Sequence, residues 1–234
     1  MSQGKLYLIP TPLGQGAIHS LPAYVIERIH QLRYFIAERA RTARRFVKAT
    51  SPPHAISELT FFELDKHQPE ASLAQFLAPL MEGHDMGLLS EAGCPGVADP
   101  GAQMVRIAHQ RSIEVVPMVG PSSILLALMA SGMNGQSFCF HGYLSPKKPN
   151  LAKDLRRLEQ QARKQRQTQL FIETPYRNQQ VVEVALQTLG PDTHLGIAAD
   201  LTLDTQYIAS RPIAQRRKAK RPDLHKRPSV FMLL

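Results

Sequence analysis

The sequence has too few cysteines for a disulfide framework or a cysteine-ligated metal cage. Its two cysteines, Cys94 and Cys139, are expected to stay free thiols, which suits a reducing compartment. It also lacks a long apolar run, since Ile124–Ala130 is far shorter than the roughly 20 residues that cross a bilayer. The first residues lack the charged and apolar segments of a signal peptide. We therefore expect a cytoplasmic protein with no membrane span and no metal site.

Two phosphate-binding motifs are absent, although the chain has glycine-rich segments. No segment matches GxxxxGK[ST], whose lysine contacts phosphates. The dinucleotide motif GxGxxG begins with Gly14 and Gly16, but His19 occupies the place of its third glycine. Tryptophan is also absent, so the sequence offers no aromatic stacking platform for single-stranded nucleic acid. These absences argue against a polyphosphate or nicotinamide ligand.

Positive charge is abundant and concentrated in three runs. The formal net charge is +9, and Arg39–Lys48, Lys147–Arg166 and Arg211–Arg227 hold 21 of the 28 lysines and arginines. Clustered cations are typical of proteins that bind nucleic acid, because they replace the counterions of the phosphates. The alternative is a solvated surface that keeps the protein soluble.

Apolar runs of strand length alternate with helix-periodic segments, which is typical of α/β proteins. With 234 residues and 43% hydrophobic content, the chain is long enough for two domains. Near the C-terminus, successive strands without helices between them predict antiparallel pairing. We predict two α/β domains, with a mainly parallel sheet in 1–117, a mixed sheet in 118–234 and a cofactor cleft between them.

The expected elements are short. Strands are predicted at Lys5–Ile9, Tyr34–Ala37, Met86–Leu89, Ile113–Val116, Phe138–His141, Leu170–Ile172, Leu195–Ala199, Thr205–Ala209 and Val230–Leu233. Helices are predicted at Leu21–Gln31, Thr42–Ala49, Ala71–Met81, Ala102–Gln110, Ser122–Ser131 and Asn150–Lys164.

Three loops of similar composition each follow a predicted strand and precede a predicted helix. They are the first loop (Ile9–Gly16, IPTPLGQG), the second loop (Leu88–Gly101, LLSEAGCPGVADPG) and the third loop (Val116–Ser123, VPMVGPSS). Glycine lets a backbone approach a ligand closely. Because the carboxyl ends of parallel strands share one sheet edge, we expect all three loops there, where ligands bind in open α/β sheets.

The polar groups of these loops suit a ligand with hydroxyls, an amine and positive charge. The loops contain no lysine or arginine but offer the hydroxyls and carboxylates of Thr11, Ser90, Ser122, Ser123, Glu91 and Asp99. S-adenosylmethionine matches this chemistry, because its ribose hydroxyls and ammonium need acceptors and cations repel its sulfonium. We expect no cation near the site. The alternative is that the loops are only tight strand–helix turns.

Five segments carry the motifs of a known family. IPTPLG in the first loop is similar to PTPIG, SEAGCP and DPG in the second to SDAGTP and DPG, and GPSS in the third to GPxA. Further along, FCFHGYL is similar to FxxxGFLP, and FIETPYR to FYESxHR. From Leu6 to Leu233 the sequence resembles the tetrapyrrole methylase family of S-adenosylmethionine-dependent methyltransferases. Its nearest branch is that of the bacterial ribosomal RNA 2′-O-ribose cytidine methyltransferases.

The resemblance implies two α/β domains, S-adenosylmethionine as cofactor and a homodimer. The residues that it assigns to the cofactor are Pro10, Thr11, Pro12, Gly14, Glu91, Ala92, Gly93, Val97, Ser122 and Ser123. We expect Arg41, Tyr143, Glu173 and Arg177 to contact the substrate. The alternative for Glu173 and Arg177 is a structural ion pair.

Several departures from the branch fall on the acceptor side. AERAR replaces AEDTR at 37–41, DKHQPE replaces HDHNE at 65–70, and DLTL replaces ELTK at 200–203. Methylation of a hydroxyl needs a base or an alkoxide-stabilising cation nearby. Glu38, at the end of a predicted strand, and His67 are the candidate bases. The alternatives are an ion pair or helix cap for Glu38 and simple packing for His67.

We favour an S-adenosylmethionine-dependent methyltransferase that acts on RNA, at a ribose 2′-hydroxyl. One alternative keeps the cofactor but takes an anionic, tetrapyrrole-like small molecule, which basic runs would also suit. Another is a non-catalytic RNA-binding relative that kept the fold. Binding of S-adenosylmethionine would separate this last alternative from the other two.

Overall fold

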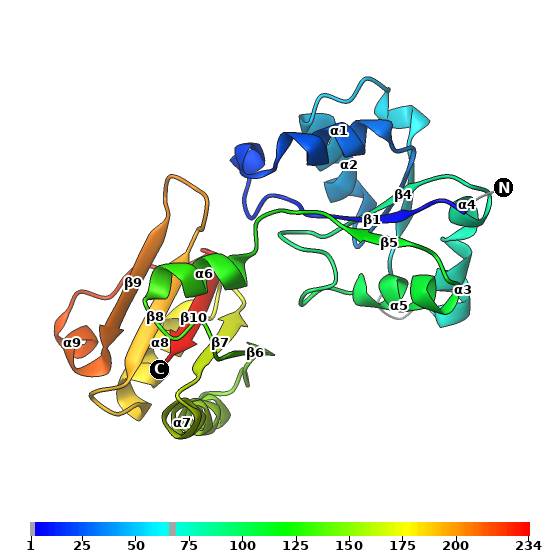
Figure 1. The fold of residues 1–234 in the computed structure, drawn as a ribbon. Coiled ribbons are helices and arrows are strands. Elements are labelled where there is room, and N and C mark those ends of the chain that lie inside the picture. The colour runs from blue at the N-terminus through cyan, green and yellow to red at the C-terminus, as the bar shows by residue number, and fades with distance from the viewer. Residues whose placement is uncertain (1–2, 66–68) are drawn as a thin grey trace. The chain divides into compact units, whose positions relative to one another are not determined.

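The computed structural model of the protein describes residues 3–65 and 69–234. The chain folds into two compact units, Met1–Ser122 and Ser123–Leu234, each built on a five-stranded sheet (Figure 1). The division that we predict after residue 117 falls at the last residue of strand β5 (Val115–Pro117). Within the described ranges, no helix is both long and apolar enough to cross a membrane.

The first unit contains a parallel sheet in the strand order β3-β2-β4-β1-β5. Its other strands are β1 (Leu6–Ile9), β2 (Tyr34–Ala37), β3 (Thr60–Glu63) and β4 (Met86–Leu89). Every pairing in this sheet is parallel, and β1 pairs with both β4 and β5. The predicted parallel sheet is therefore confirmed, and the segments that follow β1, β2, β4 and β5 emerge at one edge.

Helices cover both faces of the first sheet (Figure 1). One face carries α1 (Ala23–Gln31) and α2 (Ala40–Ala49), and the other carries α3 (Glu70–Gln75), α4 (Ala78–Met81) and α5 (Ala102–Gln110). Short 3₁₀ turns lie at η1 (Ala17–Ser20) and η2 (Ile56–Glu58). Alternate side chains of β1 divide between the two cores, since Leu6 packs with α3–α5 and Ile9 with α1 and α2. This two-sided burial explains why β4 is a continuous apolar run.

The second unit contains a mixed sheet in the strand order β6-β7-β10-β8-β9. Its strands are β6 (Phe138–Tyr143), β7 (Thr168–Glu173), β8 (His194–Ala199), β9 (Tyr207–Pro212) and β10 (Ser229–Leu233). β6 and β7 are parallel, whereas β10 pairs antiparallel with β7 and β8, and β8 with β9. The predicted mixed sheet and its antiparallel C-terminal strands are confirmed.

Helices also cover the second sheet. α7 (Lys148–Gln165) and α8 (Asn178–Thr188) pack together on one face, where Leu151, Leu155 and Leu158 join the core. α6 (Ser123–Ser131) contacts β8, β9 and β10, and Figure 1 shows it across the other face. α9 (Ile213–Lys218) follows β9 directly.

The single helix that we predict at Ala71–Met81 is wrong, because the segment forms two short helices, α3 and α4. Pro79 lies in the first turn of α4. Proline has no N–H to donate and disfavours helical backbone in the preceding residue, so a continuous helix through Pro79 would lose a hydrogen bond. At the start of a new helix the same proline carries no such penalty.

The sequence prediction also missed one strand, β3, and two α-helices, α8 and α9, besides the two short 3₁₀ turns. β3 is a four-residue edge strand with both of its end residues exposed, so its pattern of burial is weak. In α8 the buried Val181, Val182 and Val184 are β-branched, and valine favours strands. The segment is helical because its side chains pack on the sheet and on α7, and this packing overrides the local preference for a strand.

Candidate functional site

The first and second loops are joined to each other by hydrogen bonds. The Thr11 N–H donates to the Gly93 carbonyl at 2.9 Å, and the Gly93 N–H donates to the Thr11 carbonyl at 3.0 Å. The hydroxyls of Thr11 and Ser90 lie 3.2 Å apart, and the Ser90 hydroxyl donates to the Gly93 carbonyl at 2.5 Å. Gly93 has a φ of 80°, a left-handed conformation that favours glycine. The hydroxyls of Thr11 and Ser90 therefore hold the two loops together, and their contact with a ligand stays a prediction.

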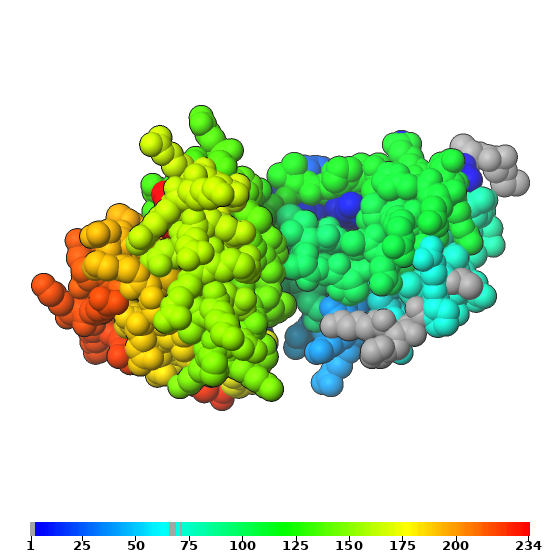
Figure 2. All heavy atoms as spheres, turned by 90° about the horizontal axis from the view of Figure 1, so that it is seen from below, coloured from blue at the N-terminus to red at the C-terminus, as the bar shows by residue number. Residues whose placement is uncertain are grey.

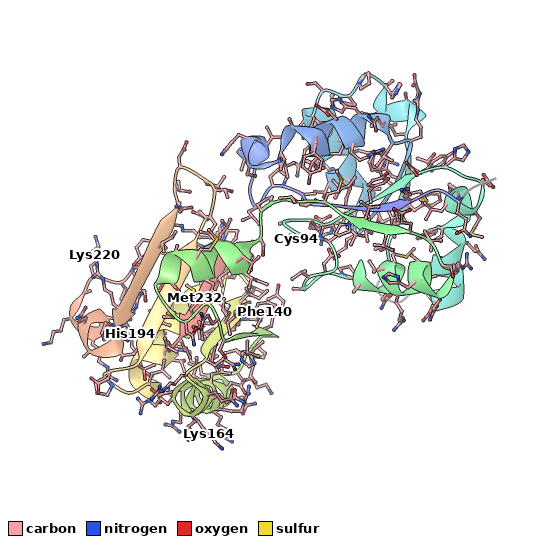
Figure 3. The ribbon with its side chains drawn as sticks, viewed as in Figure 1. Cys94, Phe140, Lys164, His194, Lys220 and Met232 are labelled. Carbon is pink, nitrogen blue, oxygen red and sulfur yellow. The ribbon has the colours of Figure 1, made fainter. Side chains whose placement is uncertain are left out.

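The third loop lies against the same two loops. A Cβ at Gly120 would overlap the ring of Pro10, so the two backbones approach as closely as only glycine allows. The Cys94 thiol, labelled in Figure 3, donates to the Pro121 carbonyl at 3.5 Å. A Cβ at Gly93 would lie 3.4 Å from the same carbonyl oxygen. The prediction that all three loops share one sheet edge is confirmed.

Two further groups of the second loop have structural roles. The Asp99 carboxylate accepts hydrogen bonds from the N–H groups of Gly96, at 3.1 Å, and Gly101, at 2.7 Å. It closes the turn before α5, so our expectation that it serves the ligand is not supported by these contacts. Burial raises the pKa of the Cys94 thiol, which makes it a poor nucleophile.

A pocket of about 350 Å³ lies beside these loops, within the first unit. One wall is formed by the first loop and by Ser90, Glu91 and Ala92 of the second. The rest of the wall is formed by Ile18 and by a face of α2, whose lining residues are Thr42, Ala43, Arg45, Phe46 and Ala49. The volume lies near the lower end of the range for small-molecule pockets and suits one nucleoside-sized group.

Glu91 is the only carboxylate in the wall of this pocket among the described residues, and its side chain is partly exposed. Burial raises the pKa of the Glu91 carboxyl, the Arg39 guanidinium opposes this rise, and the Glu38 carboxylate adds to it. A hydrogen bond from Thr42 favours the ionised carboxylate. Our expectation that no cation lies near the site is wrong, because Arg39 acts on Glu91 and Arg45 lines the pocket. Both arginines come from α2 and its N-cap, outside the three loops.

The α2 wall was missed by our sequence analysis, although a signal for it exists. Thr42, Arg45, Phe46 and Ala49 recur at helical spacing on a helix that follows the carboxyl end of β2. Its N-terminus is fixed by a neighbouring strand, since the Glu63 carboxylate at the end of β3 accepts a hydrogen bond from the Ala40 N–H at 2.7 Å. A carboxylate at this position also stabilises the positive end of the helix dipole.

Replacing Glu63 with glutamine is expected to lower the stability of the first unit by about 1 kcal/mol, because α2 loses a charged N-terminal cap. Glu58→Gln is the control, since its ion pair with Arg33 joins two largely exposed side chains and such pairs contribute little. Thermal unfolding followed by circular dichroism measures both. Equal midpoints for the two variants would contradict the role of Glu63.

Half of the predicted cofactor residues line the pocket, namely Thr11, Pro12, Gly14, Glu91 and Ala92. Pro10 lies behind them against Gly120, and Gly93 is in the bridge between the loops. Val97 is half-exposed on the second loop and does not line the pocket. Ser122 ends the first unit, and Ser123 begins α6 of the second. The assignment of these residues to the cofactor stays a prediction.

Of the two candidate bases, Glu38 and His67, the structure describes only the first. Glu38 is partly buried at the end of β2, close enough to influence the pKa of Glu91. His67 lies outside the described residues. Arg41, predicted to contact substrate, is exposed on α2 and is not part of the pocket wall, whereas its neighbours Thr42 and Arg45 are.

The other predicted substrate residues come together in the second unit. Tyr143 ends β6 beside Ile172 of β7, and Glu173 ends β7. The Arg177 guanidinium donates to the Glu173 carboxylate at 2.6 Å, and this hydrogen bond raises the pKa of Arg177. The Glu173 side chain is 1% exposed. One of its oxygens and the Nε of Arg177 are buried without a hydrogen-bond partner in the described part of the chain. Their contact with substrate stays a prediction.

Part of the basic run Arg211–Arg227 serves the fold of the second unit. Arg216 is buried and donates to the carbonyls of Leu195 and Ala209, and Arg217 donates to the carbonyls of Leu186 and Leu189. Arg227 pairs with Asp200 at 2.6 Å. These three cations stabilise loops and strand ends, so the run presents fewer cations to a ligand than its sequence suggests.

Sequence comparison places this architecture among known proteins. A sequence model of the family described as Tetrapyrrole (Corrin/Porphyrin) Methylases matches residues 5–215. The chain is 28% identical over 233 residues to the Ribosomal RNA small subunit methyltransferase I of Escherichia coli, covering 100% of this chain and 78% of that protein. It is 29% identical over 199 residues to the protein of the same name from Bacillus subtilis, covering 85% of this chain and 64% of the relative.

Solved structures show the same fold. The methyltransferase CobJ aligns with a TM-score of 0.63 at 18% identity, covering 98% of this chain and 93% of that structure. The uroporphyrin-III-C-methyltransferase of Thermus thermophilus aligns with a TM-score of 0.54 at 16% identity, covering 98% and 91%. At these identities the comparison supports the arrangement of the elements alone.

Proposed function

We propose that this chain, which belongs to the tetrapyrrole methylase family of S-adenosylmethionine-dependent methyltransferases, methylates RNA. The match to the family confirms the predicted enzyme class and cofactor, and leaves the non-catalytic alternative without support. The RNA substrate is inferred from the relatives, whose name refers to ribosomal RNA. A ribose 2′-hydroxyl is the acceptor that we favour.

The observation that carries this proposal is the pocket between the joined loops and α2. We assign the loop side, with Pro10, Glu91–Gly93 and Ser122–Ser123, to S-adenosylmethionine. The residues fit such a ligand, because Glu91 is a partly exposed carboxylate in the pocket wall and Gly93 and Gly120 let the backbones of the loops approach closely. When bound, the cofactor supplies a methyl group activated by its sulfonium.

We assign the α2 side of the pocket to the acceptor nucleotide. Arg45 would repel a sulfonium but attract the phosphate of a nucleotide. The exposed part of Phe46 offers a ring face to a base, contrary to our expectation of no aromatic stacking platform. Because the pocket has room for only one nucleoside-sized group, we assign its interior to the acceptor nucleoside and place the donor against the loops at the margin of the pocket. The chain then has to align the acceptor oxygen with the methyl group and hold it dry.

Proton removal from the acceptor falls to groups at the same edge. Glu38 lies at the end of β2 and close to Glu91, on the α2 side of the site. A cation such as Arg45 stabilises the alkoxide that develops on the acceptor, so that a weaker base can remove its proton. We therefore assign Glu38 as the base and Arg45 as the group that stabilises the oxygen.

The experiment that tests this function uses labelled S-adenosylmethionine. The protein is incubated with ribosomal RNA from cells that lack it and, separately, with an anionic tetrapyrrole. We expect label in the RNA, and nucleoside analysis then identifies the methylated atom. Label in the tetrapyrrole alone would overturn the RNA assignment in favour of a small-molecule acceptor.

We further propose that the enzyme works as a homodimer in the cytoplasm. The chain's two cysteines are free, as expected in a reducing compartment. Light scattering coupled to size-exclusion chromatography should give twice the monomer mass of 26.1 kDa. A monomer mass at micromolar concentration would contradict the dimer.

A further inference from the structure

One face of α7 is formed by cations. Lys153, Arg156, Arg157 and Lys164 are all exposed, as is Gln160 between them. At about 100° of rotation per residue, these five positions fall within an arc of about 100°. We call them the α7 basic face. The buried residues of the helix, Leu151, Leu155, Leu158 and Ala162, lie on the opposite side.

Nearby carboxylates do not neutralise this face. The two acidic residues of α7 bind backbone groups, since Asp154 accepts the Ser145 N–H at 3.0 Å and Glu159 accepts the Gly190 N–H at 2.8 Å. Glu159 also pairs with Arg163, at the flank of the face. In the part of the chain that the structure describes, no carboxylate pairs with the four cations of the α7 basic face. Figure 3 shows side chains of α7, Lys164 among them, extending away from the sheet.

The spacing of these cations is fixed by the fold. Leu151, Leu155 and Leu158 anchor α7 in the core of the second unit, and Ala162 is buried further along the helix. The helix ends at Gln165, and the next residue, Arg166, has a φ of 50° that turns the chain and lets the Gln167 N–H donate to the Ala162 carbonyl at 3.2 Å. Lys153 and Lys164 are thereby held about 16 Å apart along the axis. Figure 2 shows this segment, in yellow-green, at the surface of the second unit.

We propose that the α7 basic face binds the sugar–phosphate backbone of the RNA substrate. This inference rests on the proposed function, and it places a docking surface in the second unit, whereas the pocket belongs to the first. The length of the face matches a few consecutive phosphates of one strand. Its cations would contact phosphates and not base edges, so they would orient the RNA without reading its sequence. A membrane does not suit this face, because the apolar side of α7 is buried in the core.

The test compares two variants with the same change in charge. The first carries Lys153→Gln, Arg156→Gln, Arg157→Gln and Lys164→Gln. The matched control carries Arg211→Gln, Lys218→Gln, Lys220→Gln and Arg221→Gln, which remove four exposed cations from another part of the same unit. Affinity for the ribosomal RNA substrate is measured by filter binding between about 50 and 200 mM salt, a range over which phosphate contacts weaken strongly.

We expect the slope of log affinity against log salt to flatten by about 3 in the first variant, given close to one unit per lost phosphate contact. Affinity at low salt should fall by at least about tenfold, which is 1.4 kcal/mol. The control should keep the slope of the unchanged protein. Calorimetry with S-adenosylmethionine should give the same affinity for all three proteins. An equal affinity shows that both variants are folded and that the loss of RNA binding does not come from a damaged cofactor site.

Several results would overturn the inference. An unchanged slope in the first variant, while the unchanged protein methylates RNA, would refute the α7 basic face and leave the proposed function standing. Equal flattening in the control would mean that only net charge matters. Tighter binding of polyglutamate than of RNA, lost in the first variant, would assign the face to an acidic protein. Failure of the unchanged protein to methylate RNA would refute the proposed function itself, whatever the slopes.

Discussion

Replacing Gly120 with alanine is expected to separate the third loop from the first and to abolish most S-adenosylmethionine binding. The added Cβ would overlap the Pro10 ring, which cannot rotate away as a flexible side chain would. Overpacking of this kind costs about 1–3 kcal/mol, partly relieved by backbone shifts. The shift would fall on the loops that hold the cofactor, so we expect affinity to drop at least about tenfold.

Gly135→Ala is the matched control, because a Cβ there meets nothing within 4 Å. Calorimetry with S-adenosylmethionine and thermal unfolding of both variants measure the two effects. We expect the control to match the unchanged protein in both. If Gly120→Ala bound the cofactor with unchanged affinity, the contact between the first and third loops would be irrelevant to the site.

Replacing Glu91 with glutamine is expected to weaken S-adenosylmethionine binding by about 10- to 100-fold without lowering stability. A hydrogen bond to a charged group contributes about 1.5–3 kcal/mol, which corresponds to that range of affinity. The side chain keeps its shape but loses its charge, so the ribose hydroxyls or ammonium of the ligand lose their strongest acceptor. The same measurement on Asp99→Asn should show the smaller effect of a carboxylate that serves a turn.

The sign of the stability effect follows from the pKa of Glu91. Burial raises this pKa in the folded protein, so the ionised carboxylate lowers stability at pH values above the raised pKa. This penalty disappears as the pH falls through the raised pKa, because the group then binds its proton. At neutral pH, Glu91→Gln should therefore unfold at the same temperature as the unchanged protein or at a higher one.

Cofactor affinity should follow the opposite trend in the unchanged protein. As the pH falls through the raised pKa of Glu91, the carboxylate becomes neutral and affinity should decline. The Glu91→Gln variant should lack that decline. A variant that is clearly less stable at neutral pH, with the same pH profile of binding, would show that Glu91 is a structural residue.

The central strands of the parallel first sheet could be predicted because they are buried on both faces, whereas the edge strand β3 has exposed ends and was missed. β2 and β4 were placed at their observed bounds, since apolar runs of four residues stand between polar helices. The helix through Pro79 and the missed α8 show where local pattern fails. At Pro79 the outcome depends on a backbone hydrogen bond that proline cannot donate, and in α8 it depends on tertiary contacts. The periodicity of apolar residues indicates neither.

The chemistry of the site could be predicted only in part. The three loops were placed at one edge because parallel strands put their carboxyl ends together. The use of the Thr11 and Ser90 hydroxyls as links between loops was not predictable, because the bond joins residues 79 positions apart. The position of Arg45 in the pocket wall was not predictable either, because the face that α2 turns toward the loops depends on tertiary packing.

The sequence by itself determined the family, the α/β architecture and the three loops, because motifs and periodicity are local properties of the chain. Only the tertiary structure decided which polar groups remain available to a ligand. Glu91 lines a pocket, whereas the charged side chains of Asp99 and Arg216 form hydrogen bonds with backbone groups. Hydrogen-bond satisfaction depends on distances between residues remote in the chain, and those distances exist only once the chain has folded.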